Sequence, residues 1–185
     1  MTKKNKLIGF CLAVLASITA VFATSHADAQ INCSGLSHWS STNPQINLHH
    51  IFCGEWDSRR SRPKGFHSRP NGASPNTVGS FQISQSSNRQ GIYGINWSYA
   101  GYSGKTKFST MFPDRCTQQQ VTNSISYASS NRTSCPSNAP NWAWCGSSAP
   151  SANAGQYCNG DDGSIFTVAG AYLNDGRINT AFPLR

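Results

Sequence analysis

Acidic side chains are scarce in this chain of 185 residues. Seven Asp and Glu stand against fifteen Lys and Arg, which gives a formal net charge of +8 at pH 7. A positive protein attracts polyanions such as RNA, DNA, teichoic acid or acidic glycans over a long range. Charge of this kind also serves solubility, so the composition favours an anionic ligand without identifying one.

The sequence also lacks long apolar runs, with one exception at its start. Residues 1–6 are basic, residues 7–23 are apolar, and Ala27-Asp28-Ala29 has the A-x-A form of a cleavage site. This order is typical of a secretory signal peptide, and an uncleaved membrane anchor is the alternative. We predict a signal peptide at 1–29 and one domain at 30–185. The domain would be secreted, extracellular or periplasmic, and would have no membrane association after cleavage.

Two zinc signatures, the C-x-x-C pair and the H-E-x-x-H motif, are absent. Removal of Cys11 with the predicted leader leaves an even number of cysteines, which in an exported chain indicates up to three disulfides. A nucleophilic thiol at Cys53 would need an unpaired cysteine. Sequence alone leaves the pairing open. The remaining cysteines are Cys33, Cys53, Cys116, Cys135, Cys145 and Cys158.

Short runs of β-type residues alternate with clusters of Gly, Pro, Asn and Ser. One helix is predicted at 117–129, with Thr117 as its N-cap. Segment 46–56 indicates a strand or a short buried segment, 57–64 a solvated loop, and 131–162 a long irregular stretch ordered by disulfides. Together these elements predict an α+β domain. Strands are expected at 79–84, at 91–99, at 105–112, and on both sides of a hairpin turn at Asn174-Asp175-Gly176.

Histidine and lysine are scarce after the predicted leader. Two imidazoles and a cation suffice for metal-free RNA cleavage: one imidazole removes the proton of a ribose 2′-hydroxyl, and the other protonates the departing 5′-oxygen. A lysine would stabilise the charge on the phosphorane. The products would be 2′,3′-cyclic phosphate and 5′-hydroxyl ends. The candidates are His38, His49, His50, His67, Lys64, Lys105 and Lys107.

Three short motifs resemble those of a known family. His50-Ile51-Phe52-Cys53-Gly54-Glu55 has the form H-x-x-x-G-[DE], and Gly65-Phe66-His67 has the form G-x-H. Thr180-Ala181-Phe182-Pro183 has a Ser/Thr two residues before an aromatic and a proline. In this order they resemble EndoU-type endoribonucleases, which include nidoviral uridylate-specific enzymes and bacterial toxin nucleases. The resemblance runs from about His50 to Pro183.

The resemblance implies a catalytic role for three residues. His67 would be the general base and His50 the general acid. Lys107 would stabilise the transition state, because it lies where bacterial members place a lysine, and Lys105 is the alternative. No residue is expected to be a metal ligand.

The resemblance also implies residues that bind the substrate. Phe182 would stack on the base 5′ of the cut, and Thr180 would hydrogen-bond the edge of that base. Phe stands here where family members often have Tyr. We place Lys105 and Arg69 among the substrate-binding candidates as well.

The implied fold is RNase A-like: two antiparallel sheet lobes around a cleft, with few helices and stabilising disulfides. Residues 30–185 would then be a secreted EndoU-like nuclease domain, a bacterial toxin that cleaves single-stranded RNA 3′ of uridine. No cofactor is expected to be required, and manganese is a candidate stimulator only. The expected partner is RNA, with an immunity protein as a further candidate, and the protein is expected to be a monomer.

Other interpretations stay open at this point. Neighbours in an extended segment point to opposite faces, so we expect His49 to be structural where His50 faces the site. His38 lies outside every motif and is expected at the surface. The basic run at 59–64 is either solvated or follows RNA phosphates. The alternative functions are a non-catalytic module that binds polyanions and a hydrolase with a metal held by Glu55 and two histidines.

Overall fold

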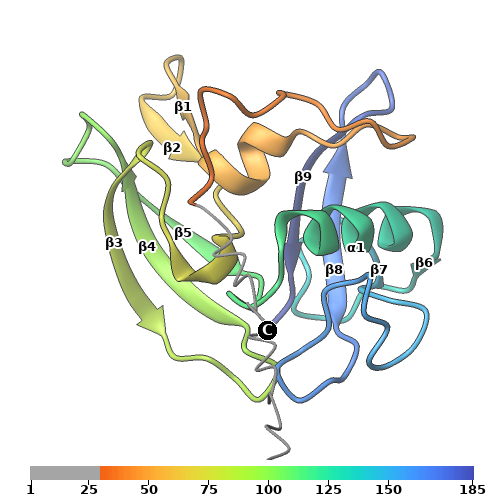
Figure 1. The fold of residues 1–185 in the computed structure, drawn as a ribbon. Coiled ribbons are helices and arrows are strands. Elements are labelled where there is room, and N and C mark those ends of the chain that lie inside the picture. The colour runs from red at the N-terminus through yellow and green to blue at the C-terminus, as the bar shows by residue number, and fades with distance from the viewer. Residues whose placement is uncertain (1–29) are drawn as a thin grey trace, which may run out of the picture.

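The computed structural model describes residues 30–185, and the predicted signal peptide at 1–29 lies outside these described residues. An antiparallel sheet of three strands lies on the left of Figure 1, and one of four strands lies on the right. The N-terminal segment crosses above both sheets. Few helices and mostly antiparallel strands make this the predicted α+β domain. In this part of the chain, no helix is long and apolar enough to span a membrane.

The three-stranded sheet has the order β3-β4-β5. Its strands are β3 (Val78–Gln85), β4 (Tyr93–Tyr99) and β5 (Thr106–Met111), which confirms the strands predicted at these three places. Side chains of β4 and β5 are buried against Phe66 in a small core that includes Trp97. This packing fixes the sheet against Phe66 of the predicted G-x-H motif.

The four-stranded sheet has the order β6-β7-β8-β9. Its strands are β6 (Arg132–Thr133), β7 (Trp144–Ser147), β8 (Thr167–Tyr172) and β9 (Ile178–Pro183). The last two pair as the predicted hairpin. The predicted irregular stretch at 131–162 thus contains two short strands, which backbone pairing stabilises without a strong side-chain pattern.

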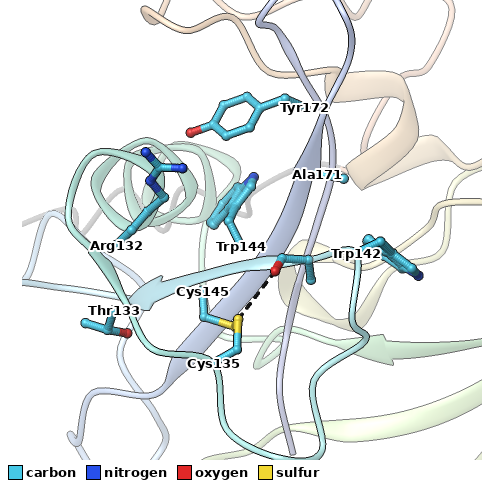
Figure 2. Close-up of a pocket in the computed structure, with 9 residues that line it drawn as sticks. Arg132, Thr133, Cys135, Trp142, Trp144, Cys145, Ala171 and Tyr172 are labelled. Atoms are coloured by element: carbon cyan, nitrogen blue, oxygen red, sulfur yellow. Dashed lines mark hydrogen bonds between the residues drawn. A yellow bond between two sulfur atoms is a disulfide. The ribbon is translucent and has the colours of Figure 1, made fainter.

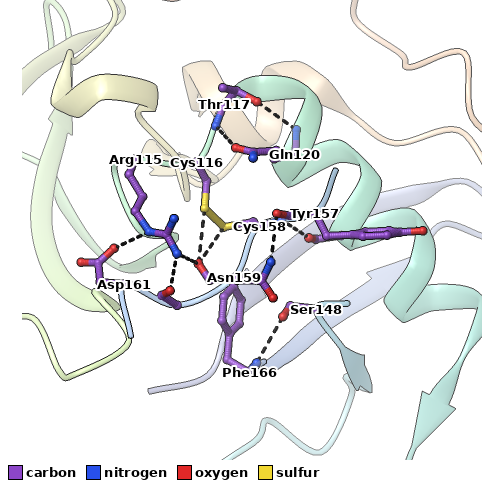
Figure 3. Close-up of a disulfide and its surroundings, with 12 residues drawn as sticks. Arg115, Cys116, Thr117, Gln120, Ser148, Tyr157, Cys158, Asn159, Asp161 and Phe166 are labelled. Atoms are coloured by element: carbon purple, nitrogen blue, oxygen red, sulfur yellow. Dashed lines mark hydrogen bonds and ion pairs between the residues drawn. A yellow bond between two sulfur atoms is a disulfide. The ribbon is translucent and has the colours of Figure 1, made fainter. Parts of the chain in front are cut away.

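The helix α1 (Gln118–Ser130) packs against β7 and β8. It begins with a capping box, as its N-cap prediction requires. The Thr117 side chain accepts a hydrogen bond from the Gln120 backbone, and the Gln120 side chain accepts one from the Thr117 backbone. Figure 3 shows both bonds. The apolar face buries Val121, Ile125 and Ala128.

Two local predictions need correction. Segment 46–56 is not a strand: it contains the π-helix η1 (His49–Cys53), whose consecutive side chains are nearly all buried. The short buried segment was therefore the correct alternative. Segment 57–64 is not a solvated loop, because β1 (Glu55–Asp57) and β2 (Arg62–Lys64) form a hairpin. Charged side chains in strands can point to solvent while the backbones pair, so the charge run did not reveal the pairing.

All six cysteines of residues 30–185 form disulfides, as predicted. The pairs are Cys33–Cys53, Cys135–Cys145 (Figure 2) and Cys116–Cys158 (Figure 3). The last pair ties the start of α1 to the segment before β8. An ion pair between Arg115 and Asp161, with a separation of 2.9 Å between Nε and Oδ1, lies beside it. These links order a stretch with few apolar residues.

Replacement of Cys116 and Cys158 by alanine is expected to destabilise the fold more than the same change at Cys135 and Cys145. The first pair spans 42 residues and the second 10, so loop-closure entropy gives losses of about 4 and about 3 kcal/mol. Cys116 and Cys158 are also both buried, whereas Cys135 is exposed. Urea unfolding of both double variants measures the difference. An equal or reversed order of stability would contradict this account.

Candidate active site

A pocket of about 630 Å³ gathers residues from the N-terminal segment and from both sheets. Five of the seven residues that the sequence nominated as catalytic or substrate-binding line it. The lining also includes cations of the β1-β2 hairpin, among them Arg60, Arg62 and Lys64. The nominated residues in the pocket are His50, His67, Lys107, Thr180 and Phe182.

His50 lies in η1 and is held by Glu55, the only glutamate of the chain. The His50 Nδ1 lies 2.8 Å from Glu55 Oε2. Although burial opposes it, the hydrogen bond from His50 and the charge of Lys64 lower the pKa of Glu55 to about 2. An ionised carboxylate only accepts hydrogen bonds, so Nδ1 of His50 donates. The reactive nitrogen of His50 is therefore Nε2.

His67 is held in the same way by a main-chain group. Its Nδ1 donates to the Thr110 carbonyl of β5 at 3.0 Å, because a carbonyl is only an acceptor. The ring centroids of His50 and His67 are 6.1 Å apart. Both imidazoles are buried and line one pocket, each with Nδ1 occupied and Nε2 left as the nitrogen for chemistry.

The two imidazoles differ in their electrostatic surroundings. Burial lowers the pKa of His50, and the Glu55 carboxylate opposes this change. Burial holds the pKa of His67 well below its ordinary value, and the positive charges of Lys107 and His50 add to the effect. His67 is therefore the more firmly neutral of the two.

Glycine is required in both histidine motifs. Gly54 has φ +68°, and a Cβ there would lie 2.3 Å from the Trp97 ring. Gly65 has φ +75°, and a Cβ there would lie 2.2 Å from the His50 carbonyl oxygen. Only glycine adopts these backbone angles without strain and leaves this space. The two glycines thus allow the turn that follows η1, at Gly54, and the turn that precedes His67, at Gly65.

Lys107 reaches the pocket from β5 and is fixed by two hydrogen bonds. Its Nζ donates to the Phe108 carbonyl and to Ser109 Oγ, both at 2.8 Å. The Ser109 hydroxyl in turn donates to the Gly65 carbonyl at 2.9 Å and accepts from Trp97 Nε1 at 3.2 Å. One buried hydroxyl therefore joins the lysine to the turn that precedes His67.

The charge of Lys107 is partly suppressed. Burial and the nearby charge of Arg62 lower its pKa to about 8. At neutral pH the ammonium is still mostly protonated. It can therefore stabilise a developing negative charge in the pocket.

The strand β9 presents an aromatic wall to the two histidines. Thr180 and Phe182 are two residues apart, so both side chains lie on one face of the strand and both line the pocket. The Phe182 ring centroid lies 5.3 Å from that of His67. A planar group stacked on Phe182 would lie next to the imidazoles.

Two nominated residues do not reach this pocket. Lys105 is exposed in the turn before β5. Arg69 makes an ion pair with Asp114 at 2.9 Å, donates to Tyr93 Oη at 2.7 Å and lies over the Phe81 ring. Its guanidinium is thus committed to internal contacts, and of the two nominated lysines only Lys107 lines the pocket.

The other two histidines stay outside the pocket. His49 donates through Nε2 to the Leu36 carbonyl at 2.8 Å, and the side chain of His38 is about half exposed. Both histidines therefore lie apart from His50, as expected. For His49 the reason differs from the expected one, because η1 is helical and alternation along a strand does not apply.

Sequence reasoning missed two residues that hold the site together. Asn47 accepts from the His50 backbone at 2.9 Å and donates to Asn179 of β9 at 3.3 Å. Ser109 joins Lys107 to Gly65. Lys107 and Ser109 are two residues apart in β5, so their side chains point to the same face of the strand. This spacing is the only signal in the sequence that links them. No sequence signal marked Asn47.

Within residues 30–185, no group of three or more His, Cys, Asp or Glu side chains is placed to hold a metal ion. The carboxylate of Glu55 is bonded to Nδ1 of His50. The metal-dependent hydrolase is therefore not supported by the described residues.

Comparison with known proteins gives one match. A family model described as bacterial EndoU nuclease matches residues 44–185. The matched region contains η1, all the strands and all five nominated residues of the pocket. No curated protein and no solved structure matches the chain.

Glu55→Gln is expected to lower the pKa of His50 further, because it removes the carboxylate that opposes the effect of burial. The pKa of His67 should change little, since a main-chain carbonyl holds its Nδ1. Titration of the imidazole resonances by NMR measures both values. Asp57→Asn is the matched control, because it removes the next carboxylate of the same hairpin, which has no bond to His50. An equal shift of His50 in both variants would refute the specific role of Glu55.

Proposed function

The chain belongs to the bacterial EndoU nuclease family, and we propose that it is a secreted endoribonuclease that cleaves single-stranded RNA 3′ of uridine. Membership of this family implies endoribonuclease activity. We propose further that the reaction is a transphosphorylation that leaves a 2′,3′-cyclic phosphate and a 5′-hydroxyl. The observation that carries this proposal is the pair of buried imidazoles, each fixed through Nδ1, beside the Lys107 ammonium.

His67 acts as the general base. Its Nδ1 proton is committed to the Thr110 carbonyl, so Nε2 carries the lone pair that accepts the 2′-hydroxyl proton. A depressed pKa keeps this imidazole neutral at physiological pH. The 2′-oxygen then attacks the adjacent phosphorus.

His50 acts as the general acid. Glu55 stabilises the imidazolium, and Nε2–H protonates the 5′-oxygen as its bond to phosphorus breaks. Burial lowers the pKa of both imidazoles, but different neighbouring charges separate the two, and such a difference in surroundings assigns the acid and the base of a pair. Here the carboxylate stands beside His50 alone, and this asymmetry supports the assignment.

Lys107 stabilises the charge that builds on the non-bridging phosphate oxygens. Preorganised cations at such positions are among the largest contributions to catalysis. Arg60, Arg62 and Lys64 of the hairpin line the same pocket and would hold the flanking phosphates.

Phe182 and Thr180 bind the base on the 5′ side of the cut. Stacking on an aromatic side chain contributes about 1–3 kcal/mol per base. The threonine hydroxyl would hydrogen-bond the uracil edge and so favour uridine. Without a hydroxyl on Phe182, sugar positioning falls to the other polar groups of the pocket.

The proposal has further parts, of which the first follows from this chemistry. The nucleophile belongs to the substrate, so we expect no required cofactor, and manganese would at most stimulate. The two sheets correspond to the lobes of an RNase A-like architecture, with the active pocket as the cleft. We further propose export after removal of residues 1–29, a monomeric toxin, and an immunity protein as its second partner.

Cleavage of a uridine-containing oligoribonucleotide in EDTA tests this function. The wild-type protein should produce 2′,3′-cyclic phosphate ends, identified by mass spectrometry, and His67→Ala should abolish them because no base remains. His49→Ala is the matched control, since this histidine lies outside the pocket, and it should retain activity. If the wild-type protein cleaves no RNA either with or without manganese, the proposed function is refuted. Salt-sensitive binding without cleavage would favour the non-catalytic polyanion-binding module.

Lys107→Arg is expected to change the alkaline side of the pH profile. The wild type loses the His50 proton first and then, above the lysine pKa of about 8, the Lys107 charge. The logarithm of kcat/KM should fall with a slope of about −1 and then about −2. The arginine variant should keep the shallower slope, because guanidinium stays charged.

Steady-state cleavage across neutral and alkaline pH gives these slopes. Lys105→Arg, at an exposed lysine outside the pocket, should match the wild-type profile. A steeper limb that persists in Lys107→Arg would assign the second ionisation to another group.

A further inference from the structure

A second pocket, with a volume of about 540 Å³, adjoins the proposed active site (Figure 2). The indole of Trp142 lines both pockets. Its ring centroid lies 5.9 Å from that of Phe182, in an edge-to-face arrangement. The second pocket therefore begins where the proposed base-binding wall ends. Its other main walls are Arg132, Trp144, Tyr172 and the Cys135–Cys145 disulfide.

The lining of this pocket combines aromatic rings with a free cation. Trp142 is 61% exposed, the largest fraction among the exposed large hydrophobic residues of 30–185, and Tyr172 is 38% exposed. Arg132 is exposed and makes no ion pair with the described residues. Among the described residues, no acidic side chain lines the pocket. Aromatic platforms beside a positive side chain are the chemistry that binds single-stranded nucleic acid.

The walls of the pocket are held in place before any ligand binds. The Tyr172 hydroxyl donates to the Ser129 carbonyl at 3.2 Å, and the Tyr172 and Trp144 rings pack with centroids 5.7 Å apart. The Cys135–Cys145 disulfide fixes the ends of the segment that carries Trp142. In Figure 2, Arg132 and Tyr172 flank Trp144, and Trp142 lies at the opposite end of the group. A rigid platform loses little entropy when a base stacks on it.

We propose that this pocket is a second nucleotide subsite of the RNA-binding surface. The nucleotide on the 5′ side of the one on Phe182 stacks on Trp142, and a phosphate of that nucleotide pairs with Arg132. This inference rests on the proposed ribonuclease function and adds to it a substrate-length requirement. RNA is favoured as the occupant because the pocket is continuous with the proposed active site through Trp142.

The test compares a uridine-containing dinucleotide with an octanucleotide that has one ribouridine in an otherwise deoxy strand. Cleavage 3′ of uridine requires uridine to be the first residue of the dinucleotide, so only the longer substrate has a nucleotide 5′ of the uridine to reach the second pocket. Trp142→Ala should lose at least roughly fivefold more kcat/KM on the octanucleotide than on the dinucleotide, as expected for one lost base stack. Trp142→Phe should retain most of the difference between substrates. Arg132→Gln should lower octanucleotide cleavage and reduce its salt dependence by roughly one phosphate contact.

Matched controls exist on other surfaces of the molecule. Tyr102 is 45% exposed and stacks on Trp56, and Arg89 is exposed beside Asp162. Tyr102→Ala and Arg89→Gln should behave as wild type on both substrates. Thermal unfolding of each variant separates a loss of binding from a loss of fold, and the phenylalanine variant tests stacking if the alanine variant is unstable.

The outcomes distinguish the subsite from the function. Equal losses on both substrates would overturn the subsite and leave the ribonuclease proposal intact. If the wild type cleaves neither substrate, the function fails, and fluorescence anisotropy of the labelled octanucleotide still tests the pocket. Weaker binding by Trp142→Ala than by Tyr102→Ala would then support the subsite, and equal binding would overturn it.

Discussion

Two main-chain hydrogen bonds between the histidine motifs set the geometry on which the site depends. The Phe66 N–H donates to the His50 carbonyl at 2.7 Å, and the His67 N–H donates to the Ile51 carbonyl at 2.8 Å. The spacing of the imidazoles is therefore a property of the backbone. Gly65 and Phe66 both have positive φ angles, which for Phe66 is a strained conformation. Its fully buried ring stabilises that conformation through packing.

The two sheets add what the histidine segment lacks. The β5 strand supplies Lys107 and the carbonyl that orients His67, while β9 supplies the aromatic wall. Main-chain bonds on both sides of the Ile178 peptide, to Gln45 and Asn47, fix β9 to the residues just before η1. Each contribution is ordinary in itself. The proposed chemistry requires that these three segments meet at one pocket, as they do here.

The sequence was informative where function requires a local pattern. The motif glycines, the histidines and the Thr-x-Phe-Pro ending have short-range reasons for their spacing, so five residues that line one pocket could be nominated from the sequence. Arg69 could not be excluded, because its partner Asp114 is 45 residues away. The β-type composition of segment 46–56 favoured a strand, but burial of these side chains in the folded protein stabilises the helix η1 there. Lys105 and Lys107 are equivalent by alternation, and only the family resemblance favoured Lys107; the structure places Lys107 within β5 and Lys105 before it.

The disulfides divide the described residues in an unexpected way. One lies within residues 30–112, which carry both histidines and Lys107, and two lie within 113–185, which carry the aromatic wall. None joins the two parts. Apart from the chain itself, the parts are held together by packing, hydrogen bonds and ion pairs such as that of Arg69 with Asp114, so the pocket is physically an interface. A cut near residue 113 would turn its assembly into a bimolecular association, governed by concentration in place of the tether.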